Sequence, residues 1–275
     1  MALRAKRTSG PSDLRGAVRT AVRRADRELR GPSVVLTRAG ARSLDAACED
    51  EFAIPSILLM ERASLGIASV VSRVCARVGA GVLVLVGPGN NGGDGLAVAR
   101  HLSDCGLRRL AVALVAEHNR IGGDSAANLL MAERVGVRIV PADERTGARV
   151  RQLASRLGRP LLIVDALLGT GLSRPASGAV RQAILACNAL RAAHADISVL
   201  SVDVPSGMDS DVGQPPPGGE CIDADATLTL AGYKSGMLPT RTRQRVSPVA
   251  VLGIGAPPRL LLRLGRLWRP LADEG

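Results

Sequence analysis

An alternation of apolar runs with helix-length segments begins after Gly79 and constrains the fold of this chain more than any other feature. The apolar runs lie at 82–86, 109–115, 137–140, 160–168 and 197–204, and helical stretches lie between them at about 94–105, 123–135, 144–157 and 177–193. Continuous apolar strands separated by helices are typical of a parallel sheet covered on both faces. The pattern predicts a three-layer α/β/α sandwich, Rossmann-like, with a mostly parallel sheet that the later runs at 224–231 and 247–255 could extend.

Two further helices are predicted before this alternation begins. Residues 37–50 read as a helix with Thr37 as its N-cap, and Pro55 opens a long amphipathic segment with apolar residues at helical spacing. At 275 residues the chain can bury a sizeable core. We expect one main domain over 33–256.

Positive charge is concentrated at the two ends of the chain. The formal net charge is +11, and residues 1–31, with nine basic and three acidic residues, contribute +6 of it. Such a balance raises the possibility of a nucleic-acid partner, but its placement favours solvated arginine-rich tails instead. We expect a basic extension over 1–32 that is poorly ordered or loosely helical, and a short basic tail over 257–275, with no nucleic acid bound.

Cysteine usage and hydropathy bear on the compartment. The five cysteines are scattered without a CxxC motif, which indicates reduced thiols and a cytoplasmic location. No apolar run reaches the roughly 18 residues of a membrane span, so no membrane association is expected. The arginine-rich N-terminus leaves organelle targeting open, although Asp13, Asp26 and Glu28 are unusual in a transit peptide.

Three loops at the predicted carboxyl ends of strands are candidates for the site. Ligands bind at this edge of a doubly wound sheet. The loops are GPGNNGGDG after 82–86, DALLGTGLSRP after the apolar residues that precede Asp165, and DVPSGMDSDVG after 199–202.

The first loop matches the dinucleotide fingerprint in its literal form. Gly87-x-Gly89-x-x-Gly92 fits GxGxxG, and Glu117 closes the next apolar run where a ribose-binding acid could lie. This match suggests an NAD(P)-dependent oxidoreductase. The fingerprint alone is a weak signal, however, and the chain has no evident Tyr–Lys or histidine-centred redox set.

Polar residues within the same loop argue for a different ligand. Glycines let the backbone approach a phosphate or sugar at a helix N-terminus. Asn90, Asn91 and Asp94 are not needed for that purpose, and an acid there would repel a pyrophosphate. Asp94 could instead cap the helix or accept a hydrogen bond from a sugar hydroxyl.

The other two loops each begin with an aspartate at a strand end, Asp165 and Asp203. Two acids at equivalent positions, beside an asparagine-rich loop, indicate a shared polar pocket. Its carboxylate, amide and hydroxyl oxygens suit a hard cation rather than zinc. The three histidines lie outside these loops, so aspartate is the natural candidate for general acid and base.

Four segments, in order, resemble the NAD(P)H-hydrate epimerase family, also known as the YjeF N-terminal domain. They are LTRAGARSLDAACEDEFAIPSILLMERAS, GPGNNGGDGLAVARHL, VDALLGTGLSRP and VDVPSGMDSDVG, and the resemblance covers roughly residues 35–255. It implies a Rossmann-like sandwich, commonly a homodimer, that interconverts the R and S epimers of hydrated NADH and NADPH (NADHX and NADPHX). It also implies a partner, an ADP- or ATP-dependent dehydratase that repairs the S form.

The resemblance further implies roles for individual residues. Asp203 is the expected proton-transfer residue and Asp165 the second candidate, although a carboxylate that holds a cation is a poorer base. A potassium ion would be held by Asn91, Asp165 and Ser206. The implied substrate-binding residues are Asn90, Asn91, Gly92, Gly93, Asp94, Gly169, Thr170, Gly171, Leu172, Ser173, Arg174, Pro175 and Asp203.

Two alternatives to an epimerase remain at this stage. The first is a non-catalytic binding module of the same fold, with a protein or RNA partner, which the basic ends would suit. Such a module would be free to lose four polar residues that are all present here, namely Asn91, Asp165, Asp203 and Ser206. The second is the oxidoreductase suggested by the glycine fingerprint.

Overall fold

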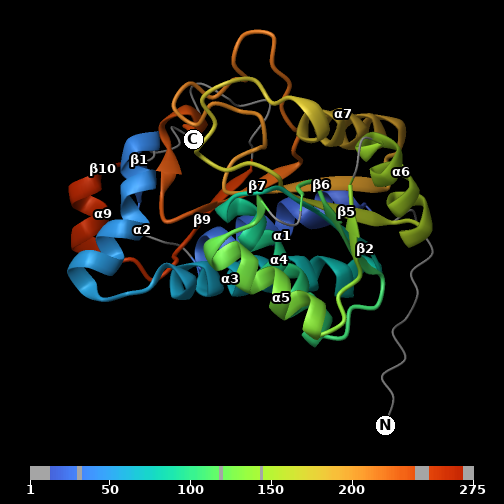
Figure 1. Cartoon of the computed structure of the whole chain (residues 1–275), viewed down its shortest axis with the longest axis horizontal. Coiled ribbons are helices and arrows are strands. Elements are labelled where there is room, and N and C mark those ends of the chain that lie inside the picture. The colour runs from blue at the N-terminus through green and yellow to red at the C-terminus, as the bar shows by residue number, and fades with distance from the viewer. Residues whose placement is uncertain (1–12, 30–32, 118–119, 143–144, 239–247, 269–275) are drawn as a thin grey trace, which may run out of the picture.

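A seven-stranded parallel sheet forms the middle layer of the protein (Figure 1). The computed structural model describes residues 13–29, 33–117, 120–142, 145–238 and 248–268. The strand order is β4-β3-β2-β5-β6-β7-β9. The strands are β2 (Gly81–Val86), β3 (Leu110–Leu114), β4 (Ile139–Pro141), β5 (Leu161–Ala166), β6 (Ile197–Val202), β7 (Ala226–Leu230) and β9 (Val249–Leu252).

Helices cover both faces of this sheet. One face packs against α1 (Leu14–Glu28), α3 (Ser56–Val78), α4 (Asn90–Asp104) and α5 (Gly123–Arg134), and the other against α6 (Thr146–Leu157) and α7 (Gly178–Ala193). Side chains alternate along each strand. Val84 accordingly lies in the core beneath α3 and α4, whereas Leu83 and Leu85 lie in the core beneath α6 and α7. The predicted three-layer α/β/α sandwich is confirmed.

The topological switch point lies between β2 and β5. From β2 the chain moves outward to β3 and β4, and then returns to pair β5 on the opposite side of β2. The connections that leave β2 and β5 therefore diverge to opposite faces and leave a crevice at their carboxyl ends. Two of the three loops singled out from the sequence follow these two strands.

Most predicted elements are confirmed, but α4 begins earlier than the sequence suggested. The helix starts at Asn90, directly after Gly89, rather than near residue 94. Glycine disfavours a helix interior by about 1 kcal/mol per residue, which is why the sequence pattern placed the start later. Close packing decides otherwise: a Cβ added to Gly95 would lie 2.6 Å from the Cβ of Ala166 on β5.

The N-terminal region contains an ordered helix, so the expectation of poor order over 1–32 is wrong for residues 14–28. The apolar side chains of Leu14, Val18 and Val22 are fully buried in the core that α1 shares with α3 and the sheet. Asp13 caps the helix by accepting a hydrogen bond from Gly16 N at 2.8 Å. The many arginines concealed this apolar spacing. Residues 1–12 and 30–32 lie outside the described part of the chain.

A small second sheet joins the two ends of the chain. Its order is β10-β1-β8, in which β1 (Val34–Leu36) pairs antiparallel with β10 (Gly265–Leu267) and parallel with β8 (Tyr233–Lys234). Two helices lie beside it, α2 (Arg38–Phe52) and α9 (Pro258–Leu264). The region expected to be a basic tail therefore contributes α9 and β10, while residues 269–275 lie outside the described part.

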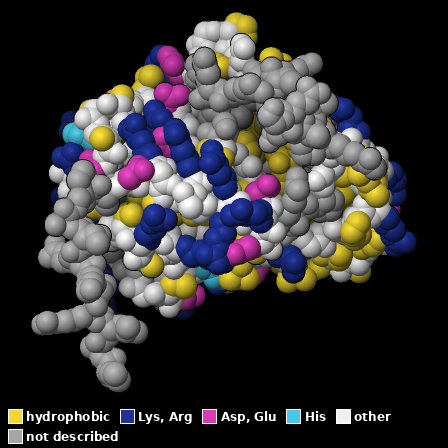
Figure 2. Space-filling model, turned by 180° about the vertical axis from the view of Figure 1, so that it is seen from behind, with side chains coloured by type: hydrophobic (Ala, Val, Ile, Leu, Met, Phe, Trp, Pro, Cys, Tyr) yellow, Lys and Arg dark blue, Asp and Glu magenta, His cyan; other side chains and the backbone are white. Residues whose placement is uncertain are grey.

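Surface charge is mixed rather than purely basic. Figure 2 shows Lys and Arg side chains gathered on one face with acidic side chains among them. Glu28 at the end of α1 accepts hydrogen bonds from Arg24 at 2.6 Å and from Arg73 at 2.7 Å. Within the described residues, no helix combines the length and the apolar character that a membrane span requires.

Substitution of Leu14 by alanine should lower the free energy of unfolding by about 2–5 kcal/mol, because it removes a fully buried side chain and leaves a cavity beneath α1. Urea unfolding followed by circular dichroism measures this loss. Arg23→Ala, at an exposed position of the same helix, is the matched control and should change stability by less than about 0.5 kcal/mol. An unchanged midpoint for Leu14→Ala would show that α1 is not part of the cooperative core.

Candidate active site

A cavity of about 650 Å³ opens at the switch point of the sheet. Its wall is built by α2, the N-terminal turns of α3 and α4, the loop that follows β5, and the turn between β7 and β8. The sequence predicted this location, since ligands of doubly wound folds bind outside the carboxyl ends of the strands.

Ten of the residues expected to bind substrate line this cavity. They are Asn90, Asn91, Asp94, Gly169, Thr170, Gly171, Leu172, Ser173, Arg174 and Asp203. The other three, Gly92, Gly93 and Pro175, are not part of the lining, and neither are Asp165 and Ser206. The structure therefore brings the three loops together at one cavity, but only some of their predicted site residues line it.

The glycines of the first loop serve backbone packing. A Cβ added to Gly87 would lie 1.8 Å from the carbonyl oxygen of Leu167, and one added to Gly92 would lie 2.0 Å from the carbonyl oxygen of Gly87. Real Cβ atoms do not approach so closely, so both positions require glycine. Gly87 therefore allows the turn after β2 to contact the loop after β5, and Gly92 allows the turn to fold tightly on itself, which gives both glycines a structural role.

Asp203 occupies a strained position at the end of β6. Its φ angle is +65°, a left-handed conformation that non-glycine residues rarely adopt. The Oδ1 atom accepts hydrogen bonds from Leu230 N at 3.2 Å and from Thr229 Oγ1 at 3.4 Å, and it forms an ion pair with Lys234. Such strain persists only where surrounding contacts impose it, and it is concentrated at functional sites.

Asp165 is fully buried at the end of β5, and its carboxylate is saturated with hydrogen bonds. It accepts from Ser201 Oγ at 2.8 Å, from Ser206 N at 2.9 Å and Ser206 Oγ at 2.5 Å, and from Leu167 N at 3.3 Å. Burial raises the pKa of Asp165, and the hydrogen bonds from Ser206 oppose that shift. Ser206 in turn accepts from Leu168 N at 2.8 Å, which ties the group to the cavity wall.

Asn91 presents an unpaired amide in the lining of the cavity. Both its Oδ1 and Nδ2 atoms are buried and have no hydrogen-bond partner within the described residues. Buried polar groups are normally satisfied, so an unpaired amide needs an explanation such as a ligand or ion. Gly169 lies directly beside it, since a Cβ added there would be 3.4 Å from the Cβ of Asn91.

Two more carboxylates face the cavity near Asp203. Burial raises the pKa of Asp94 well above its usual range, with smaller contributions from the charges of Asp203 and Asp45 and an opposing one from Lys234. Burial also raises the pKa of Asp45, followed by the charges of Asp203 and Asp124. The cavity thus holds several acids whose negative charges disfavour one another.

Sequence reasoning missed two residues of this site, Lys234 and Asp45. Lys234 lies outside the three loops, and a signal was present: it is one of only two lysines among 36 basic residues. Asp45 lies in the upstream segment that carries the family resemblance, on α2. Only the fold brings both of them into the cavity.

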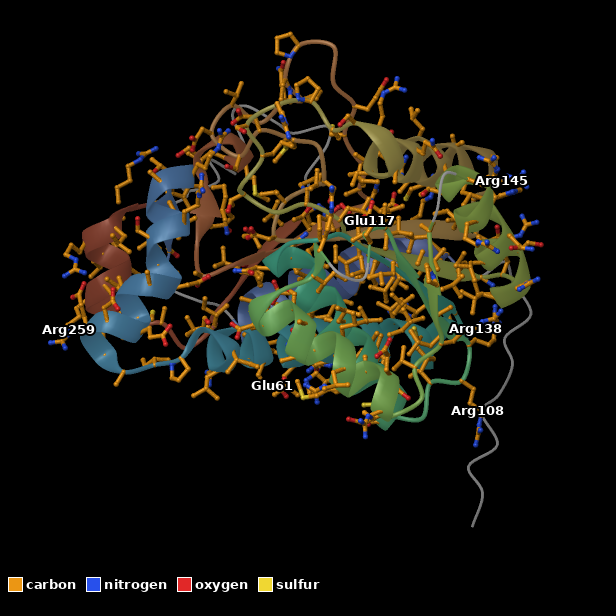
Figure 3. All side chains as sticks on the ribbon, in the orientation of Figure 1. Glu61, Arg108, Glu117, Arg138, Arg145 and Arg259 are labelled. Atoms are coloured by element: carbon orange, nitrogen blue, oxygen red, sulfur yellow. The ribbon has the colours of Figure 1, made fainter. Side chains whose placement is uncertain are left out.

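Glu117, labelled in Figure 3, is not part of the cavity. Its side chain is 68% exposed and pairs with Arg120 at 3.4 Å. A ribose-binding acid would have to face the bound nucleotide. The structure therefore gives no support to the oxidoreductase interpretation.

Comparison with known proteins agrees with this geometry. The family model for the YjeF-related protein N-terminus matches residues 56–236. The NAD(P)H-hydrate epimerase of Rhodopirellula baltica is 34% identical over 220 residues, covering 80% of this chain and 84% of the relative. The NAD(P)H-hydrate epimerase of Pirellula staleyi is 31% identical, covering 82% of this chain and 95% of the relative.

Two further similarities concern length and fold. The bifunctional NAD(P)H-hydrate repair enzyme Nnr of Salinibacter ruber is 35% identical over 240 residues, which are 83% of this chain but 42% of the relative. The crystal structure of yeast ynu0 matches with a TM-score of 0.68 at 24% identity, over 88% of this chain and 96% of that one, and this likeness shows the fold alone. The matched family model and the epimerase relatives show that the chain belongs to the YjeF-related family, which includes the isomerases named NAD(P)H-hydrate epimerases.

Proposed function

We propose that this chain interconverts the R and S epimers of NADHX and NADPHX at the cavity beside β2 and β5. The observation that carries the proposal is the convergence of Asn91, Asp94 and Asp203 on one cavity at the switch point. The names of the curated relatives supply the substrate class. The volume of about 650 Å³ lies within the range typical of small-molecule sites.

Aspartate chemistry suits the composition of the cavity. Among the described residues that line it there is no histidine or cysteine, so carboxylates are the natural general acids and bases. Asp203 is the proposed proton-transfer residue because it lines the cavity and its Oδ2 atom borders the space beside Gly169. Asp165 is a weaker candidate, since it lies behind the wall and its lone pairs are occupied.

Asp94 faces the same cavity from α4. Burial, followed by the charges of Asp203 and Asp45, raises the pKa of Asp94 well above its usual range and so favours its neutral form. A carboxyl group in that form can donate a hydrogen bond to a substrate hydroxyl, whereas Asp203 is the proposed proton acceptor.

A bound potassium ion is part of the proposal, held by Asn91, Ser206 and Asp165. The amide oxygen of Asn91 is an unpaired donor of the kind a hard cation prefers, and Ser206 and Asp165, which are hydrogen-bonded to each other, would exchange that contact for the ion. Within the described residues, no group of three or more His, Cys, Asp or Glu side chains could hold a metal ion. A potassium ion there would supply fixed positive charge beside the substrate.

The expected partner is a dehydratase dependent on ADP or ATP that acts on the S epimer. The support comes from the bifunctional repair enzymes among the relatives, of which this chain spans less than half. A homodimer follows from the family resemblance and stays a prediction, as does a cytoplasmic location. The alternative of a non-catalytic binding module does not account for strain at Asp203 or for acids grouped around a single cavity.

Asp203→Asn should lower kcat by about 100- to 10,000-fold, because it removes the proposed base with little change in shape. The assay supplies the R epimer of NADHX together with an S-specific dehydratase and follows the return of NADH by absorbance. Asp104→Asn, at an exposed position of α4, is the matched control and should leave the rate unchanged. A wild-type protein that gives no acceleration would overturn the proposed function, and normal turnover in Asp203→Asn would remove Asp203 from its role.

Asn91→Ala should raise the potassium concentration needed for half-maximal activity, because it removes the unpaired amide from the proposed cation site. The measurement is epimerase rate against potassium concentration at constant ionic strength, with sodium as the balancing ion. Activity that is the same in either salt, for the wild type and for the variant, would argue against a potassium site.

Asp94→Asn should stabilise the protein at pH 8 and make no difference near pH 3. Because the folded-state pKa of Asp94 is raised, stability falls as the pH rises from the unfolded-state pKa to the folded-state pKa, and the full loss is present above the latter. Thermal unfolding measures the difference, at roughly 2–4 °C for each kcal/mol in a domain of this size. A variant that is less stable than the wild type at pH 8 would show that Asp94 is held as a stabilising anion.

A further inference from the structure

Lys234 is a buried cation that the expected chemistry leaves unused. It lies on β8, is 2% exposed, and lines the cavity. Burial of an ammonium group is costly unless the group is paired and hydrogen-bonded. Its partners should therefore reveal why a lysine is placed here.

Four oxygen atoms surround the ammonium group. They are Asp203 Oδ1, Leu230 O at 2.7 Å, Thr229 Oγ1 at 3.1 Å and Gly232 O at 3.2 Å. An ammonium has three donors and no lone pair, so this shell suits a fixed cation and leaves nothing free to attack a substrate. Lys234 therefore acts on Asp203 rather than on the substrate itself.

The two oxygens of the Asp203 carboxylate have different surroundings. Oδ1 receives Lys234, Leu230 N and Thr229 Oγ1, whereas Oδ2 has no hydrogen-bond donor within the described residues. A Cβ added to Gly169 would lie 3.6 Å from Oδ2 and 3.6 Å from Asn91 Cγ. The free oxygen thus borders the same space as the unpaired amide of Asn91.

We propose that Lys234 is a positioning residue that holds Asp203 Oδ1, so that Oδ2 is the atom that exchanges a proton with the substrate. This inference rests on the proposed epimerase function. Oδ2 takes the proton of the substrate hydroxyl and passes it to the ring nitrogen, as the carbon–nitrogen bond at the hydroxyl-bearing carbon breaks and a carbonyl forms. The reverse transfer closes the ring on the other face of that carbonyl, so the carboxylate ends the cycle as it began. The ammonium donates to Oδ1 throughout and transfers no proton.

The backbone around both residues supports this arrangement. The turn between β7 and β8 contains Ala231 at a φ angle of +64°, and Asp203 itself is left-handed. Lys234 pairs with Leu36 of β1 in the small sheet. The small sheet therefore holds Lys234 at the cavity through the pairing of β8 with β1.

Other charges near Asp203 make a fixed cation necessary. Asp94 and Asp45 line the same cavity, and each interacts unfavourably with Asp203. Arg42 and Arg174 also line it but have no hydrogen bond or ion pair with Asp203 within the described residues. Lys234 is the cation that directly contacts its carboxylate.

Lys234→Met tests the proposal by removing the cation while keeping an unbranched apolar stem. We expect kcat for epimerisation to fall by about 100-fold or more, because the base loses its orientation. KM should stay within a few-fold of the wild type, because the substrate keeps its contacts. Lys234→Arg should recover part of kcat, since it restores a cation. Arg263→Met is the matched control: it removes the α9 cation from an exposed ion pair with Glu51 of α2 and should leave kcat unchanged.

A second measurement does not depend on activity. With 13C-labelled aspartate, the carboxyl resonance of Asp203 is identified by its absence in Asp203→Asn, and it should move in Lys234→Met but stay in place in Arg263→Met. If Lys234→Met fails to fold, the double variant Lys234→Met/Asp203→Asn should recover the melting temperature without recovering kcat, because no unpaired buried charge remains.

Three outcomes would overturn the proposal. They are a kcat of Lys234→Met within threefold of the wild type, a loss confined to KM, and an unmoved Asp203 resonance. A wild-type protein without epimerase activity would defeat the proposed function separately, and a moved resonance would then still establish that Lys234 orients Asp203.

Discussion

The site depends on the contact between the turn after β2 and the loop after β5. Gly87 permits this contact, because a Cβ there would overlap the carbonyl oxygen of Leu167, and Gly92 keeps the turn itself tight, because a Cβ there would overlap the carbonyl oxygen of Gly87. It allows α4 to begin at Asn90, directly at the edge of the sheet, so that Asn91 and Asp94 face the cavity. A glycine pattern typical of dinucleotide binding is used here to bring two strand ends together.

Charge around the cavity is arranged in two layers. Asp94, Asp45 and Asp203 face the open space, and Lys234 balances the last of them. Asp165 lies behind the wall, where hydrogen bonds from Ser206 and Ser201 offset its burial. The first layer is suited to chemistry on a substrate. The second holds the loops in place and could contribute to a cation site.

Most of the fold was predictable because the core is aliphatic and the sheet is parallel. Strands buried on both faces appear as continuous apolar runs, and all seven of the predicted runs became strands of the main sheet. The buried packing of α1 was not predicted, because arginines separate its apolar residues and only a loose helix or poor order was expected there. The early start of α4 was missed because local propensity disfavours glycine, whereas tertiary contact requires it.

The sequence by itself determined the fold class, the edge of the sheet that carries the site, and the three loops that supply Asn91, Asp94 and Asp203. These follow from the spacing of apolar residues along the chain and from the rule that ligands bind at the carboxyl ends of parallel strands. Only the tertiary structure decided that Asp165 lies behind the cavity wall and that Lys234 contacts Asp203. The reason is that both depend on side-chain contacts between segments distant in sequence, and no periodicity encodes which oxygen of a carboxylate a distant ammonium will hold.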